Sequence, residues 1–453
     1  MNTYKTQLTY RLLLALCCLV PAELLAQSRN DRNQPAGELR RQAFLGVSLS
    51  SPDASAAGAL VRRVVDAGVA TQTGLRQNDR VLRINNTLLD SADALQRVLI
   101  SLRAGDTARF EIVRDGQTLN PTSTLQGLPR EQLQGVETIY DSAAVADRNF
   151  RVRTIVTRPR NATGKLPAVF LVGWLSCDSV EYPFGPGDDG FGQLLHDVAT
   201  QSGHVLIRMD KPGIGDSEGP NCAETDFQTE LAAYRAAFRT LKRYDFVDLD
   251  RVFMLGLSNG GGFAPLVAQD EKVRGYVVAG GWSKTWFEHM MELERRRLKL
   301  SGKKPGEVSD AMKGYAEFYT DYLRRKMTPG EIAKAKPQLS SLWYDEPEHQ
   351  YGRPASFFHQ LEDLNLSASW DKVDAPVLVM HGEYDWIMSR DDHTLIAEIV
   401  NSKQAGRARF VELPKTDHLF MTFENMNKAF DGEGGRYNKS VTEQVLTFLR
   451  ENR

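Results

Sequence analysis

Short, almost wholly apolar segments recur from residue 168 onward, with longer helical stretches between them. Near-continuous apolar strands are typical of a parallel sheet that is covered by helices on both faces. The clearest helical stretch is 224–244, where apolar residues recur on one stripe. The pattern therefore predicts an α/β fold with a mainly parallel sheet. The apolar segments are 168–172, 204–209, 251–255, 273–278, 376–380 and 408–413.

Composition narrows the class of protein further. The chain has 453 residues, of which 42% are hydrophobic and 25% charged, and this excludes a disordered chain or a coiled coil. Lys and Arg number 56 against 58 Asp and Glu, so no basic footprint for nucleic acid exists. The mean hydropathy of -0.38 and the lack of a long apolar run exclude a polytopic membrane protein.

The first residues have the features of a secretory signal peptide. Lys5 and Arg11 precede a short apolar core at 12–20, and a small residue, Ala26, ends a plausible cleavage site. That core is far shorter than the roughly 20 residues that a membrane-spanning helix requires. We expect 1–26 to be removed and the protein to be exported, to the periplasm or outside the cell.

The cysteines fall into two pairs. Cys17 and Cys18 lie in the signal peptide, and a lipoprotein anchor is disfavoured because bulky Leu16 stands where a small residue is expected. Cys177 and Cys222 would remain in an oxidising compartment, where a disulfide between them and two separate buried thiols are both open. Neither has a C-x-x-C neighbour, so the sequence predicts no metal site.

The chain between the signal peptide and residue 127 divides into two parts. Residues 27–42 are polar and without periodicity, and we expect a flexible leader there. Residues 43–127 combine short strands with short helices and contain Phe44-Leu45-Gly46-Val47 and the run GLRQNDRVLRIN at 74–85. With these two motifs the segment resembles a PDZ domain, although Asn78 replaces a glycine of the family signature.

The resemblance implies a peptide-binding site. The terminal carboxylate of a peptide would meet the backbone N–H groups of Leu45 and Gly46, and the peptide would add a strand to the edge that begins at Val47. The alternative is a degenerate module that only packs against its neighbour.

A G-x-S-x-G motif follows the apolar strand at 251–255. It reads Gly256-Leu257-Ser258-Asn259-Gly260, and a helix is expected from about Phe263. A sharp turn from strand to helix requires small residues on both sides and exposes the serine hydroxyl above the sheet. We therefore expect Ser258 to be a nucleophile.

A serine nucleophile needs a base and an orienting carboxylate, and the sequence offers both at strand ends. Asp385 follows the strand at 376–380, and His418 follows the strand at 408–413. The order Ser, Asp, His resembles that of the α/β-hydrolase superfamily, which implies its fold for residues 128–453. Two rivals remain: Asp417 as the acid, and His381, which we interpret as structural.

An oxyanion hole requires two backbone N–H donors. Asn259 supplies one, and the loop after Val172-Gly173 supplies the other. That loop departs from the common His-Gly pair of the superfamily, and by position the donor is Trp174, with Leu175 as the alternative. The loop at 210–217 resembles the superfamily's D-x-x-G-x-G-x-S turn, which we expect to brace the nucleophile.

A helical insertion between about 283 and 370 occupies the place where this superfamily carries its lid. Trp174, Trp282 and Trp386 fall just beyond predicted strand ends. They indicate an aromatic pocket for an apolar group of the substrate, although core packing would explain them equally well.

The sequence as a whole predicts an exported serine hydrolase that needs no cofactor. An esterase or acyl hydrolase is favoured, and a serine peptidase of the aminopeptidase type and an inert scaffold are the alternatives. The expected partners are a small ester or peptide substrate and a peptide C-terminus at the PDZ domain.

Overall fold

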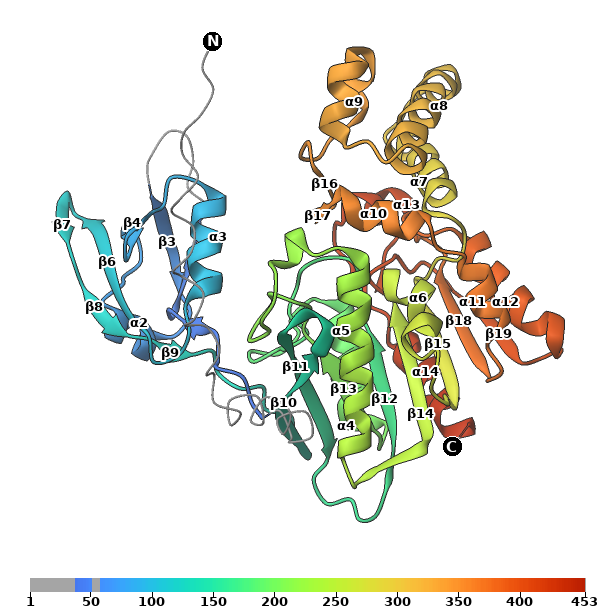
Figure 1. Cartoon of the computed structure of the whole chain (residues 1–453), viewed down its shortest axis with the longest axis horizontal. Coiled ribbons are helices and arrows are strands. Elements are labelled where there is room, and N and C mark those ends of the chain that lie inside the picture. The colour runs from blue at the N-terminus through green and yellow to red at the C-terminus, as the bar shows by residue number, and fades with distance from the viewer. Residues whose placement is uncertain (1–36, 51–57, 453) are drawn as a thin grey trace, which may run out of the picture. The chain divides into compact units, whose positions relative to one another are not determined.

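The computed structural model describes residues 37–50 and 58–452, which contain a small sheet near the N-terminus and a large sheet from residue 136 onward (Figure 1). The predicted signal peptide, 1–26, and most of the predicted leader lie outside these residues. Among the residues described, no helix has the length and apolar character needed to cross a membrane.

The small sheet has the strand order β2-β3-β4-β6-β7, with β5 and β8 paired to its side. Its core consists of alternate residues such as Val81, Phe110 and Ile112, all buried. β2 is the first strand of the order and pairs with β3 alone among the described strands. The elements of this part are β1 (Ala43–Phe44), β2 (Val47–Leu49), β3 (Ala59–Val64), α2 (Ala67–Thr73), β4 (Arg80–Ile84), β5 (Thr87–Leu88), α3 (Ala92–Ser101), β6 (Thr107–Arg114), β7 (Gln117–Leu119), β8 (Thr122–Thr124) and β9 (Gln126–Gly127).

The large sheet has eight strands in the order β10-β11-β13-β12-β14-β15-β18-β19. β10 pairs antiparallel with β11 and β11 with β13, and the remaining pairs are parallel. The prediction of a mainly parallel sheet is thus confirmed. The strands are β10 (Val136–Val145), β11 (Phe150–Pro159), β12 (Leu166–Val172), β13 (Val205–Met209), β14 (Val247–Leu257), β15 (Gly275–Ala279), β18 (Val377–Gly382) and β19 (Ala408–Leu413).

Helices cover both faces of this sheet, which explains why its strands are apolar throughout. Along β12, Phe170 belongs to one core and its neighbours Val169 and Leu171 belong to the other. Phe170 packs edge-on against Phe238 of α5, and the second core includes Leu194 of α4. The covering helices are α4 (Gly190–Gln201), α5 (Phe227–Arg239), α6 (Asn259–Val267), α11 (Leu366–Asp371), α12 (Arg390–Lys403) and α14 (Lys439–Glu451), and a further short helix is α13 (Met426–Asp431).

The segment between β15 and β18 is helical, as expected. Figure 1 shows its helices gathered at one end of the large sheet. Thr285 caps the first of them through a reciprocal pair of hydrogen bonds with Glu288. The elements are α7 (Trp286–Leu300), α8 (Pro305–Tyr319), α9 (Pro329–Ala335), the short pair β16 (His349–Gln350) and β17 (Arg353–Pro354), and α10 (Ala355–Glu362); the pair β20 (Met421–Thr422) and β21 (Arg436–Tyr437) lies near the C-terminus.

The described end of the predicted leader is packed, which differs from the flexible segment expected. The Arg41 guanidinium binds Glu181 at 2.9 Å and Asp216 at 2.6 Å, and its side chain is 11% exposed. Arg153 of β11 binds the same two carboxylates. A polar sequence without periodicity can therefore be ordered when its charges meet partners from distant parts of the chain.

Candidate active site

Ser258 lies in a sharp turn between β14 and α6. Its backbone has a positive φ, with φ 53° and ψ -126°, which is a strained conformation for a residue other than glycine. The flanking glycines permit this turn. A Cβ on Gly256 would lie 2.7 Å from the Gly261 Cα, and one on Gly260 would lie 2.2 Å from the Val172 carbonyl oxygen.

The structure brings Ser258, His418 and Asp385 into a single chain of hydrogen bonds. His418 Nε2 is 2.9 Å from Ser258 Oγ, and His418 Nδ1 is 2.8 Å from Asp385 Oδ2. An ionised carboxylate can only accept, so Nδ1 donates to it and Nε2 is left to accept from the serine hydroxyl. All three side chains are buried.

The charges of the pair favour an ionised Asp385. Burial alone would raise the pKa of Asp385, but the charge of His418 and the hydrogen bond to it lower this pKa to about 2. The other carboxylate oxygen accepts the N–H groups of Ile387 and Met388. Burial lowers the pKa of His418, and the charge of Asp385 more than offsets this, so the pKa of His418 is raised.

The rival residues lie nearby but have other contacts. The Asp417 carboxylate accepts the N–H groups of Leu419 and Met421 in its own turn, and burial raises its pKa to about 6. The His381 ring packs against the His393 ring at a tilt of 57°, with 4.8 Å between the ring centroids. The described hydrogen bonds of the His418 ring go to Asp385 and Ser258, which favours Asp385 over Asp417 as its partner.

The two predicted oxyanion donors lie beside Ser258. Asn259 is the first residue of α6, and Trp174 follows the end of β12; both line the same cavity as Ser258 and His418. The preceding amide, Gly173 N–H, donates to the Tyr234 hydroxyl at 3.0 Å. The roles of Trp174 and Asn259 as donors remain predictions.

The cavity above Ser258 has a volume of about 310 Å³ and mostly apolar walls. Trp174 and Trp386 line it, whereas Trp282 is fully buried behind it and packs against Trp286. Sequence reasoning missed most of the wall that the helical insertion contributes. That wall comprises Trp286, His289, Leu293, Arg297, Tyr344 and Tyr351. No motif marks these positions within the helical insertion that the sequence predicted.

The insertion contributes several polar groups to the cavity. Burial lowers the pKa of His289 to about 4, which keeps this ring neutral at ordinary pH. The Arg297 guanidinium binds Glu294 at 2.6 Å, and the hydroxyls of Tyr344 and Tyr351 are 3.0 Å apart. The insertion therefore adds charged and hydroxyl groups to a lining that is otherwise mostly apolar.

Cys177 and Cys222 form a disulfide. Cys177 follows the loop that carries Trp174, and Cys222 opens a short turn before α5. The bridge joins two loops that leave the same edge of the sheet.

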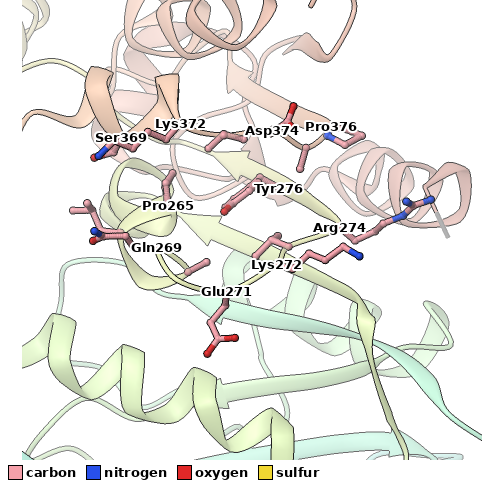
Figure 2. A pocket seen from close by; sticks show the side chains of 15 residues that line it. Pro265, Gln269, Glu271, Lys272, Arg274, Tyr276, Ser369, Lys372, Asp374 and Pro376 are labelled. Atoms are coloured by element: carbon pink, nitrogen blue, oxygen red, sulfur yellow. The ribbon is translucent and has the colours of Figure 1, made fainter. Parts of the chain in front are cut away.

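A second cavity, of about 480 Å³, lies at the opposite edge of the sheet (Figure 2). Its walls come from the segments that lead into β15 and β18, and Lys272, Arg274, Tyr276 and Asp374 are among the residues around it. Ser258 follows the other end of the parallel neighbour β14. This cavity contains none of the predicted site residues.

The sheet order and its covering helices define a fold of the α/β-hydrolase class, with a Ser-His-Asp arrangement at its strand ends. A family model described as serine aminopeptidase, S33, matches residues 190–422, and the chain belongs to this family. A PDZ domain model matches residues 43–124. Both resemblances inferred from the motifs are thereby confirmed.

Individual relatives match different parts of the chain. Esterase EstD of Thermotoga maritima is 20% identical over 298 residues, which are 65% of this chain and 64% of that protein. A probable periplasmic serine endoprotease, DegP-like, of Chlamydia trachomatis is 32% identical over 117 residues, 24% of this chain and 23% of its own length. The chain thus spans less than two thirds of either relative. An esterase structure from Pyrococcus furiosus, 12% identical, covers 71% of this chain and 97% of its own, with a TM-score of 0.43.

Proposed function

We propose that this protein is an exported esterase or acyl hydrolase in which Ser258, His418 and Asp385 form the catalytic triad. The observation that carries the proposal is the pair of hydrogen bonds, 2.9 and 2.8 Å long, that joins the three side chains beneath an aromatic cavity. The similarity to an esterase over 65% of the chain supports the ester preference.

The geometry gives each group a role. Ser258 Oγ attacks the ester carbonyl as its proton passes to His418 Nε2, and the tetrahedral oxyanion is held by the N–H groups of Trp174 and Asn259. The C–O bond to the alkoxide breaks as His418 returns the proton to it. Water then repeats the sequence on the acyl-serine and releases the acid. Asp385 orients His418 and stabilises its charged form.

A peptidase is the second candidate, because the matched family is described as serine aminopeptidase. An aminopeptidase site has to hold the charged amino terminus of its substrate. Among the described residues that line the cavity, none is a carboxylate, and the permanently charged one is the cation Arg297. The lining therefore favours an uncharged acyl group over an ammonium group.

Ser258→Ala tests the proposal with two matched substrates, a p-nitrophenyl acyl ester and an aminoacyl p-nitroanilide. We expect wild type to cleave the ester and the variant to lose at least about 10⁴-fold in kcat, because the nucleophile is gone. The midpoint of thermal unfolding serves as the control for folding. Comparable Ser258-dependent cleavage of the anilide would make the protein a peptidase, and an inert wild type would make it a scaffold.

We also propose that the PDZ domain binds peptide C-termini. β2 lies at the end of its sheet order, where a strand can be added, and Gly46 precedes it with φ 72°. A Cβ on Gly46 would lie 2.5 Å from the Ala70 amide nitrogen, so the loop requires glycine. The check is the anisotropy of a labelled peptide with an apolar C-terminal residue, added to the Ser258→Ala protein. Amidation of the peptide should weaken binding at least about tenfold; equal binding would contradict a carboxylate site.

Export of the protein is supported by two observations. The Cys177–Cys222 disulfide suits an oxidising compartment, and the PDZ region is similar to a probable periplasmic protein. The mass of the mature protein should correspond to a chain that begins at Gln27, and an intact Met1 would contradict cleavage.

A further inference from the structure

Lys211 is a buried lysine whose ammonium group faces the loop that carries Trp174. It belongs to the loop after β13, and it is 4% exposed. Its Nζ donates to three consecutive backbone carbonyls, those of Trp174, Leu175 at 2.9 Å and Ser176 at 3.0 Å. We call residues 173–178 the oxyanion loop, because it contains the proposed donor.

These three contacts fix the direction of the peptide groups. In a planar trans peptide the C=O and the following N–H point to opposite sides. Three carbonyls that converge on one ammonium therefore turn the N–H groups of Leu175, Ser176 and Cys177 away from Lys211. Leu175 is the alternative oxyanion donor, and the N–H of Trp174 belongs to the peptide group directly before these three. The oxyanion loop also lines the cavity that contains Ser258. The orientation of the loop relative to the nucleophile thus depends on the contacts with Lys211.

Three other charged groups face Lys211. Glu230 of α5 lies 3.5 Å from its Nζ, and Arg353 of β17 binds Glu230 at 2.6 Å. Arg353 also donates to the Leu175 carbonyl at 3.1 Å. Asp178, on the oxyanion loop itself, adds a negative charge nearby.

We propose that Lys211 is a positioning residue that holds the oxyanion loop in its catalytic orientation only while its side chain is protonated. This inference rests on the proposed function, since it concerns stabilisation of the oxyanion formed at Ser258. An ammonium has three N–H donors for the three carbonyls. A neutral amine has two donors and a lone pair, so it can serve only two of the three carbonyls. Of the three, only the Leu175 carbonyl has a second described donor, Arg353.

Protonation of Lys211 changes within an accessible pH range. Burial lowers the pKa of Lys211 to about 8; Glu230 opposes this shift and Arg353 adds to it. In the unfolded chain this lysine has an ordinary pKa, near 10.4. Between about pH 8 and pH 10.4, Lys211 is therefore protonated more fully in the unfolded chain than in the folded chain. The contribution of Lys211 to stability therefore rises with pH from about 8 to about 10. A loss of activity in that pH range would therefore not be caused by unfolding, as far as the titration of Lys211 is concerned.

The test measures kcat and KM for the p-nitrophenyl ester between pH 6 and 10. Only the turnover that the Ser258→Ala variant lacks is counted. In wild type, kcat should rise as His418 loses its proton and fall above about pH 8. Lys211→Met should lower kcat about 10- to 100-fold at pH 7.5, with KM changed less than about threefold, because the oxyanion donor is displaced. Lys211→Arg, which stays charged, should retain more activity than Lys211→Met and show no fall near pH 8.

The matched control is Lys242→Met, a lysine that is 57% exposed and paired with Glu271. It should keep both the wild-type kcat and the alkaline fall. Wild-type kcat in a folded Lys211→Met, or an alkaline fall near pH 8 that persists in Lys211→Arg, would overturn the proposal. The pH profile of Lys211→Arg tests the proposal even if Lys211→Met fails to fold. Full ester turnover by Ser258→Ala would instead overturn the proposed function.

Discussion

Asp385→Asn should lower kcat for the ester by about 10⁴-fold while the protein stays folded. The neutral amide can offer an N–H to His418 Nδ1, and the ring then carries its hydrogen on Nε2. In that tautomer Nε2 cannot accept the proton of the Ser258 hydroxyl. The amide can still accept one of the backbone N–H groups of Ile387 and Met388 with its oxygen, so the turn after β18 should survive. Steady-state kinetics and the thermal unfolding midpoint, measured together, check this result.

Asp417→Asn is the matched control for that prediction. Asp417 adjoins His418 in the sequence, but its carboxylate accepts the N–H groups of Leu419 and Met421. We expect a fall in kcat of less than about tenfold, because the hydrogen bond that orients His418 is left in place. If Asp417→Asn lost as much activity as Asp385→Asn, the assignment of the acid would be wrong.

Gly260→Ala should disrupt both stability and catalysis. The added Cβ would lie 2.2 Å from the Val172 carbonyl oxygen and 2.4 Å from that of Gly173. Both are backbone atoms, at the end of β12 and the start of the oxyanion loop, and neither can rotate away. We expect the free energy of unfolding to fall by about 3 kcal/mol. Since the displaced strand leads into the oxyanion loop, kcat should fall about 100-fold in the molecules that fold. Urea denaturation and kinetics provide the two measurements.

Gly306→Ala is the control, with the same change of residue at an open position. Gly306 lies in the first turn of α8, and a Cβ there would contact nothing within 4 Å. Alanine should leave kcat unchanged and stabilise the protein by about 0.4–1 kcal/mol, because it restricts the unfolded chain. A similar loss of stability in both variants would show that the crowding at Gly260 is not the cause.

The strands of the large sheet could be predicted because burial on both faces leaves a continuous apolar signature. The ends of the strands could be predicted less well. The predicted strand at 251–255 lies within β14, which runs from Val247 to Leu257. The helix after Ser258 begins at Asn259 and not near Phe263, because three glycines made its first turn look unlike a helix. A Cβ on Gly262 would lie 2.5 Å from the Trp282 indole nitrogen, so close packing explains this glycine.

The residues of the candidate site also fall into those that could be predicted from the sequence and those that could not. Ser258, Asp385 and His418 could be found because each follows a recognisable strand, and parallel strands end at one edge of a sheet. The walls supplied by α7 and by the chain before β17 carry no such mark, since their contacts depend on how the insertion packs. Lys211 belonged to a recognised turn, but the carbonyls that it binds are more than thirty residues away in the sequence.

Because of the helical insertion between β15 and β18, the proposed reacting groups and much of the binding wall come from different segments of the chain. The proposed reacting groups come from loops that follow β12, β14, β18 and β19, whereas much of the binding wall comes from the single stretch between Trp286 and Tyr351. Exchange of that one stretch would change which molecules enter the cavity, provided that the new stretch keeps the contacts of Arg296 with the carbonyls of Trp386 and Ile387 in the loop after β18. Proteins that share this architecture can therefore change their substrate range through one contiguous segment of the chain.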